Sequence, residues 1–158
     1  MTTVVSLVEQ FLACAKPIVD DPATPPHSLR VAEDQLEAEL TFPVQSSDGF
    51  EVRITVNKLG VRVHSGELVH AGIEHSKDPR GAVEAAFGMA RDLLSPQMRL
   101  RERYVGERII WAAVERFDGT VWRRSYDSGR LLFNYFGRRR ESIFVNRQLP
   151  GRPSPATS

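Results

Sequence analysis

The stretch from Arg108 to Gln148 constrains the fold most, because apolar and polar residues alternate in it between short turn signals. This pattern indicates four β-strands joined by tight turns. Both tryptophans of the chain, Trp111 and Trp122, lie in the stretch, together with eight of the thirteen aromatic residues in total. A strand series of this kind must bury at least one face of a sheet, so the sequence predicts a C-terminal antiparallel meander.

The first third of the chain predicts a helix and then a strand. Val4–Lys16 carries apolar residues at helical spacing, and we expect Pro17 to end that helix. A proline-rich connector follows over Asp20–Ser28. Residues 29–40 fit a helix, but alternation from Leu36 onward favours a strand, and we predict a strand over residues 35–44.

Two hairpins are predicted next. Residues 50–57 alternate as a strand that returns along residues 35–44, with one core face and one polar, acid-leaning face. Residues 60–73 predict a second hairpin that turns at Ser65-Gly66. With a two-residue turn, His64 pairs with Glu67 and Val61 pairs with His70. The two histidines then lie on opposite faces, which argues against a shared metal ion.

Asp78-Pro79 opens the clearest helix, because aspartate is a good N-cap and proline a good first helical residue. An apolar stripe continues to Leu94, and Ser95-Pro96 ends the helix. Gln97–Val105 is a further strand candidate. The fold class is therefore predicted to be α+β, two helices on antiparallel sheet, in the order α-β-β-β-β-α-β-β-β-β-β. We expect one domain over residues 1–149 and a disordered tail over residues 150–158.

The turns of the C-terminal stretch predict which side chains share a face. A two-residue turn at Asp118-Gly119 pairs Glu115 with Trp122 and Trp111 with Tyr126. The predicted core face, packed under the Pro79–Leu94 helix, is mainly aliphatic and comprises Ile110, Ala112, Val114, Val121, Leu132, Phe136, Ile143 and Val145. The opposite face is aromatic and comprises Trp111, Phe117, Trp122, Tyr126, Phe133, Tyr135 and Phe144.

Two interpretations of the aromatic face compete. Large aromatic residues usually build cores, so the face could pack on a second layer of the same chain. Alternatively, part of it is open and binds a partner, since Trp, Tyr and Arg dominate interface energetics. The residues predicted to bind a partner are Trp111, Trp122, Arg124, Tyr126, Phe133, Tyr135, Arg138, Arg139 and Arg140. The last three are expected at a turn.

Charge is distributed unevenly along the chain. Residues 1–90 carry seven basic and thirteen acidic residues, whereas residues 91–158 carry fourteen arginines and seven acidic residues. Such asymmetry favours an acidic protein partner, or RNA or single-stranded DNA, for the basic half. Attraction between the two halves, within one chain or in a homodimer, is the simpler alternative.

Motifs with a chemical mechanism are absent. The sequence has no G-x-x-x-x-G-K-[ST], G-x-G-x-x-G, H-E-x-x-H, C-x-x-C or G-x-S-x-G. We therefore expect no enzyme, no cofactor and no metal site. Cys14 lies beside the apolar stripe of the first helix, where an inert, buried thiol is expected. A single cysteine, no apolar run of membrane-spanning length and no secretory signal predict a cytosolic protein without membrane contact.

Residues 80–125 resemble small bacterial proteins encoded beside toxins. The similarity lies in Gly81–Phe87, the Ser95-Pro96 break, Arg101–Arg108 and Ala113–Trp122. Such immunity proteins bind and occlude a toxin, so the resemblance implies a non-enzymatic protein that sequesters a protein partner. A dimeric secretion chaperone is a variant, because those proteins also alternate helix, strands, helix and strands. They are usually acidic, unlike this basic C-terminal half.

Overall fold

The computed structural model describes residues 4–75, 77–129 and 137–146. Two helices and nine strands form an α+β arrangement with two antiparallel sheets, which confirms the predicted fold class. Five strands precede the second helix and four follow it within these residues. The predicted tail at 150–158 and the predicted strand around Phe133 and Tyr135 lie outside the described residues.

The N-terminal sheet is a five-stranded meander in chain order. Its strands are β1 (Ser28–Val31), β2 (Ala38–Phe42), β3 (Val52–Asn57), β4 (Gly60–Ser65) and β5 (Val69–Ile73). Strict burial alternation in β2 and β3 follows from their sequence alternation, because successive side chains point to opposite faces. The predicted strand over 35–44 is confirmed as β2. Residues 29–31, which lie in the segment that also fitted a helix, belong to β1.

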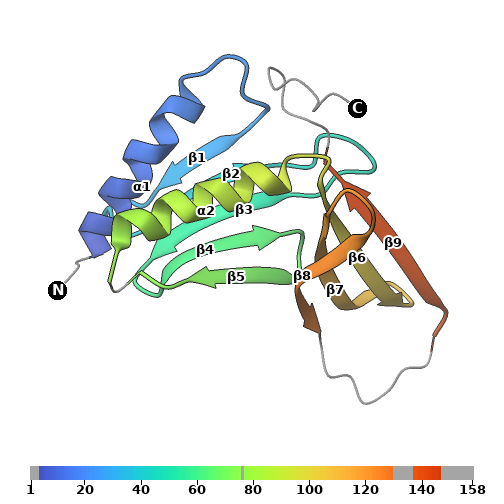
Figure 1. Ribbon diagram of the computed structural model, residues 1–158. Helices are drawn as coiled ribbons and strands as arrows, with labels where there is room; N and C mark the ends of the chain where they lie inside the picture. Colours follow the sequence, from blue (N-terminus) through green and yellow to red (C-terminus); the bar gives the residue numbers. More distant parts are fainter. Residues whose placement is uncertain (1–3, 76, 130–136, 147–158) are drawn as a thin grey trace.

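Both helices cover the same face of this sheet, as Figure 1 shows. They are α1 (Val4–Val19) and α2 (Pro79–Leu93). Phe11 of α1 meets Phe87 of α2 with ring centroids 5.3 Å apart, above the fully buried Leu40 and Ile54. The expectation that Pro17 ends the first helix was wrong, because the Asp20 N–H still donates to the Lys16 carbonyl and closes one more turn.

The start of α2 is as predicted. Asp78 is its N-cap, and the carboxylate accepts a hydrogen bond of 2.8 Å from the Gly81 N–H. Its position was predicted wrongly, however. α2 packs beside α1 on the N-terminal sheet and not under the C-terminal sheet, which it reaches only with its C-terminal end. The helix buries more apolar surface on the long aliphatic N-terminal sheet than it would under the C-terminal sheet. The residues of its apolar stripe include Val83, Ala86, Phe87 and Leu93.

The C-terminal sheet has the order β8-β7-β6-β9, so it is a meander only over its first three strands. Those strands are β6 (Met98–Val105), β7 (Arg108–Phe117) and β8 (Trp122–Gly129). β9 (Arg139–Val145) then pairs with β6 at the opposite edge. The prediction of a plain meander was wrong at this last step, because a chain that leaves β8 can pair with either open edge.

The two sheets meet through one face of the C-terminal sheet, which we call the inner face. It carries the buried Met98, Leu100, Ala112 and Val114, and β5 contacts both β7 and β8. Figure 1 shows the C-terminal sheet at the end of the molecule, beyond the ends of β4 and β5. Apolar side chains from both sheets thereby form one continuous core.

Candidate functional site

The other face of the C-terminal sheet, which we call the outer face, carries no packed helix or strand from the described part of the chain. Strand register assigns its members. It comprises Arg99, Arg101 and Arg103 on β6, Trp111, Ala113, Glu115 and Phe117 on β7, Trp122, Arg124 and Asp127 on β8, and Arg139, Glu141, Ile143 and Val145 on β9.

Guanidinium groups cover the tryptophan rings of the outer face. The Arg103 guanidinium lies 4.6 Å from the Trp111 ring centroid, and that of Arg124 lies 5.4 Å away. The Arg99 guanidinium lies 4.3 Å from the Trp122 ring. Such contacts attract the cation to the negative face of the ring and hold both side chains in place. The Trp111 indole N–H also donates to Asp127 at 3.0 Å, which fixes that ring in one orientation.

Two carboxylates, Glu115 and Glu141, link the arginines of β6 on this face. Glu115 accepts a hydrogen bond of 2.6 Å from Arg99 Nε and lies 3.3 Å from Arg101 Nε. Glu141 lies 3.1 Å from Arg103 Nε and 3.8 Å from the Arg101 Nη1 atom. Glu115 is buried although its strand faces outward, because the neighbouring long side chains lie over it.

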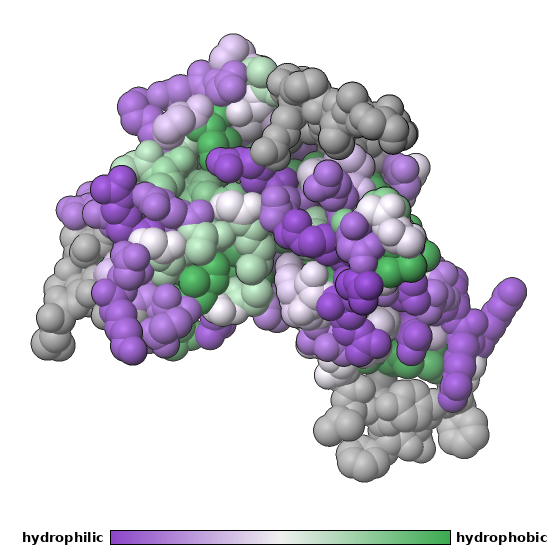
Figure 2. All heavy atoms as spheres, viewed as in Figure 1, coloured by the Kyte–Doolittle hydropathy of each residue, from purple (hydrophilic) through white to green (hydrophobic). Residues whose placement is uncertain are grey.

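Several residues of the outer face remain accessible. Phe117 and Ile143 are exposed by 40% and 46%, and Trp111 and Trp122 are half-buried. Figure 2 shows apolar patches among mainly hydrophilic side chains over the C-terminal sheet in that view. The outer face therefore offers fixed aromatic anchors and charged groups together.

The structure brings together only part of the predicted partner-binding set. Trp111, Trp122 and Arg124 share the outer face, and Arg139 lies at its edge. Arg140 points to the inner face, with its guanidinium 4.0 Å from the Tyr104 ring. Arg139 and Arg140 belong to β9, so only Arg138 precedes the strand. Phe133 and Tyr135 lie outside the described residues.

Tyr126 was assigned to the wrong face. The loop between β7 and β8 pairs Phe117 with Trp122, and a bulge between Val114 and Glu115 then pairs Val114 with Tyr126. One extra residue on β8 reverses the face of everything beyond it. Tyr126 therefore packs on the core, where its hydroxyl lies 3.4 Å from Ser65 Oγ and burial raises its pKa.

Four assignments on β9 and the β7–β8 loop were also wrong. Phe144 pairs with Leu100 and belongs to the inner face, not the aromatic one. Ile143 and Val145 lie on the outer face and Val121 is exposed by 47%, although all three were predicted as core. The errors on β9 share one cause, since β9 pairs with β6 and so does not continue the register of β8. Val121 lies in the loop between β7 and β8, outside both strands.

Residues that the sequence reasoning missed are the arginines of β6. Arg99, Arg101 and Arg103 alternate with Leu100 and Glu102, a pattern that predicts one arginine-lined face of a strand. Glu102 points inward and accepts a hydrogen bond from the Tyr104 hydroxyl. Burial, that hydrogen bond and nearby carboxylates raise the pKa of Tyr104 to about 12.

No family model, curated protein or solved structure matches this chain. In the described part of the chain, neither helix is long and apolar enough to cross a membrane.

The histidines of the N-terminal sheet are the nearest approach to a metal site. The prediction that they lie on opposite faces was wrong, because the turn spans residues 66–68 and pairs His64 with His70 directly. Their Nδ1 atoms are 2.7 Å apart, and His64 Nε2 lies 2.9 Å from Thr55 Oγ1. Within the described residues no three metal-binding side chains cluster, so this pair has no third ligand.

Protonation of His64 is expected to destabilise the fold. Burial, and then Arg53, His70 and Arg62, lower the pKa of His64 to about 4, whereas an unfolded histidine titrates near 6.5. The unfolded chain therefore binds the proton more tightly. We expect stability to be constant above about pH 6.5 and to fall by about 1–2 kcal/mol as the pH drops toward 4, after allowance for partial solvent screening.

Urea unfolding at several pH values measures this loss, with His64→Gln as the matched variant. The variant should lack the component of the slope between about pH 6.5 and 4. Equal slopes in the two proteins would show that His64 does not supply the proton linkage. A control variant, Lys58→Ala, changes an exposed charge in the β3–β4 turn and should keep the wild-type slope.

Proposed function

We propose that this chain is a non-enzymatic binding protein that sequesters an acidic segment of a partner protein on its outer face. The observation that carries the proposal is a sheet face that no described helix or strand covers, on which three arginines hold two tryptophans in fixed positions. Aromatic and arginine side chains supply most of the energy in protein interfaces. Side chains that are already ordered lose little conformational entropy on binding, which favours affinity.

Charge supports an acidic partner. The outer face carries Arg99, Arg101, Arg103, Arg124 and Arg139 against Glu115, Asp127 and Glu141. The exposed Arg138 adjoins it. Arg103 and Arg124 keep more than half of their side-chain surface exposed, so their remaining N–H donors are available to a carboxylate.

Nucleic acid is the weaker alternative for the same surface. Bases bind to aromatic residues by stacking on an open ring face. On the outer face, arginine already lies over the ring of each tryptophan, and Trp122 also contacts Phe117 at 5.2 Å between centroids. Three carboxylates on the same face would further repel a phosphate backbone.

The proposal matches the expectation of an immunity-like protein, in which binding alone blocks the partner. It includes the cytosolic location predicted from the single cysteine and does not require a cofactor. A secretion-chaperone-like dimer would need a second copy on this face, and the arginine excess disfavours such self-association because like charges would oppose each other.

A matched pair of variants tests the proposed function. Arg103→Ala/Arg124→Ala removes the two guanidinium groups beside Trp111, and both are exposed enough that stability should change by less than about 1 kcal/mol. Wild-type and variant proteins serve as bait in extracts of the cells that produce the chain, with Arg80→Ala as the surface control. We expect an acidic protein that wild type and control capture and the double variant loses, with affinity at least about tenfold weaker.

Direct titration completes the test. A captured protein that binds all three baits equally would contradict use of the outer face. A fluorescent single-stranded RNA or DNA twenty-mer titrated at low salt checks the alternative, because binding through arginines would be tight there and fall steeply as salt rises. Such binding, lost in the double variant, would replace the protein partner by a nucleic acid.

A further inference from the structure

A small apolar cavity lies between the two helices and the N-terminal sheet, near the C-terminal end of α2. Its volume is about 130 Å³. Phe87 and Ala90 of α2 and its C-cap Leu94 line one side, and Ile18 and the loop after α1 line the other. Phe42 and Ile54 of the sheet form its floor. All of these except Ile18 and the loop residues are buried, so the cavity reaches into the core.

The volume of the cavity limits the size of the apolar group that it can hold. An engineered apolar cavity of about 150 Å³ stays dry and takes up benzene. A cavity slightly smaller than that accommodates the side chain of leucine, methionine or phenylalanine. Filling it with such a group would bury apolar surface that now lacks contacts on one side.

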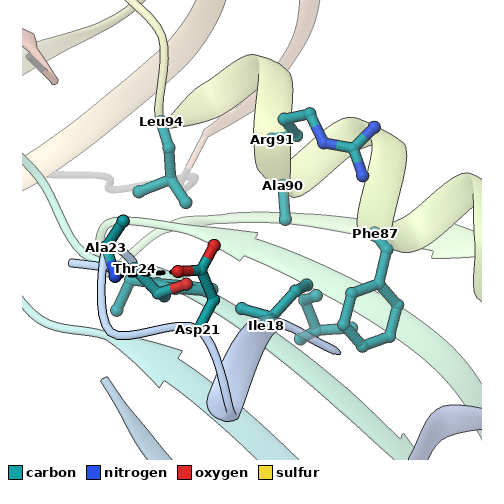
Figure 3. Close-up of a pocket in the computed structure, with 10 residues that line it drawn as sticks. Ile18, Asp21, Ala23, Thr24, Phe87, Ala90, Arg91 and Leu94 are labelled. Atoms are coloured by element: carbon teal, nitrogen blue, oxygen red, sulfur yellow. Dashed lines mark hydrogen bonds between the residues drawn. The ribbon is translucent and has the colours of Figure 1, made fainter. Parts of the chain in front are cut away.

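The rim of the cavity carries one charge of each sign. Asp21 lies in the loop after α1, and Arg91 lies on α2. Figure 3 shows the Asp21 carboxylate rising from the loop toward α2, and the Arg91 side chain extending from the last turns of that helix. Among the described residues Arg91 forms no ion pair, and it does not pair with Asp21 although both line the same space.

The Asp21 carboxylate is held in position. Its Oδ1 atom accepts a hydrogen bond of 2.8 Å from the Ala23 N–H, which leaves Oδ2 for another donor. The adjacent Asp20 is neutralised by Lys16 at 2.7 Å, so Asp21 keeps its own charge available. A ligand with an anionic group, a cationic group and a short apolar chain would satisfy Arg91, Asp21 and the cavity together.

We propose that this cavity binds an apolar α-amino acid. The α-carboxylate would accept paired hydrogen bonds from the Arg91 guanidinium, and the α-ammonium would donate to Asp21 Oδ2. The side chain would occupy the space between Phe87, Leu94 and Ile54. This inference is independent of the proposed function, because the outer face contributes no residue to the cavity.

Calorimetric titration of the full chain with L-leucine tests the proposal. We expect saturable binding of L-leucine, and at least about tenfold weaker binding of N-acetyl-leucine and of leucinamide, since each lacks one of the two charges. L-Serine should not bind, because its side chain cannot fill the cavity. If L-leucine, L-methionine and L-phenylalanine all fail to bind at about 10 mM, the proposal is wrong.

Variants assign the contacts. Arg91→Gln and Asp21→Asn should each weaken L-leucine binding by about tenfold. Arg80→Gln makes the same change on the exposed surface of α2, away from the cavity, and should bind as wild type does. Equal binding by Arg91→Gln and wild type, or equal binding of leucine and leucinamide, would overturn the zwitterion site. The Arg103→Ala/Arg124→Ala protein should still bind L-leucine, which separates this result from that for the outer face.

Discussion

Replacement of Glu115 by alanine is expected to lower the free energy of unfolding by about 3 kcal/mol, because it leaves two arginines without a counter-charge. Glu115 is the central carboxylate of the outer face, and its side chain is only 9% exposed. Arg99 and Arg101, which it neutralises, are 15% and 25% exposed. Breaking a largely buried ion pair costs more than forming it contributes, since the remaining charge stays poorly solvated.

The effect on thermal stability follows from that loss. For a chain of this size, about 3 kcal/mol corresponds to a drop in Tm of roughly 6–12 °C. Among the described residues Arg101 Nε has no hydrogen-bond partner, so the Arg101 charge depends on Coulomb attraction to Glu115 and Glu141. Glu115→Gln keeps an acceptor for Arg99 but removes the charge, and it should fall between wild type and Glu115→Ala.

A matched exposed pair provides the control. Asp92 and Arg116 lie 2.6 Å apart, the same distance as Glu115 and Arg99, but both side chains are more than 40% exposed. Asp92→Ala should therefore change stability by less than about 0.5 kcal/mol. If Glu115→Ala proves as mild as Asp92→Ala in denaturant unfolding, water screens the network as fully as it screens a surface pair.

Local sequence patterns predicted the two helices and most of the strands correctly. Asp78-Pro79 sets the start of α2 through the hydrogen-bond geometry of a helix N-terminus, which involves neighbours in the chain alone. The alternation from Val52 to Asn57 likewise becomes the burial pattern of β3. Such features depend on residues within a few positions of each other, so periodicity and capping rules capture them.

Long-range pairing could not be derived in the same way. Nothing near Arg139–Val145 records that this strand pairs with β6, forty positions earlier, and not with β8. The bulge opposite Val114 reverses the face of Tyr126, and a turn of three residues in place of two brings His64 against His70. In each case a shift of one residue in the strand register changes which side chains share a face. The packing of the whole sheet determines that register.

In the candidate site, some residues could be placed from the sequence and others required the strand pairing. Trp111, Trp122 and Arg124 share a face as predicted, because Trp111 and Glu115 alternate regularly along β7 and the bulge lies beyond Arg124 on β8. Two of the three arginines that cover the tryptophans, Arg99 and Arg103, come from β6. Placing them required the β6–β7 register, in which they lie opposite Glu115 and Trp111. Composition indicated an arginine-rich half, but only pairing places those arginines over aromatic rings.

Asn146 is expected to be the second large contributor to stability, since it joins three segments that are distant in the sequence. Its Oδ1 atom accepts a hydrogen bond of 3.0 Å from the Phe50 N–H, and its Nδ2 atom donates to the Leu93 carbonyl at 3.1 Å. Leu93 is the last residue of α2, where backbone carbonyls lack partners within the helix. The side chain of Asn146 thus ties the end of β9 to α2 and to the loop before β3.

Asn146→Ala should lower the free energy of unfolding by about 3 kcal/mol. It leaves the Phe50 N–H and the Leu93 carbonyl without their hydrogen-bond partner, and Asn146 is only 8% exposed. Asn57→Ala is the matched control. Asn57 accepts from the Leu59 N–H at 2.8 Å on the exposed β3–β4 turn, where water can replace it, so the loss should stay below about 1 kcal/mol. Denaturant unfolding of both variants measures the difference.

Asn146→Asp separates hydrogen bonding from shape at the same position. The ionised aspartate keeps an acceptor for Phe50 N–H but places a second oxygen against the Leu93 carbonyl, so it should destabilise the fold at neutral pH. Protonation supplies an O–H donor to that carbonyl, and the deficit relative to wild type should therefore shrink as the pH falls through the range where aspartate titrates. A deficit that stays constant with pH would mean that the Leu93 carbonyl does not need the Asn146 donor.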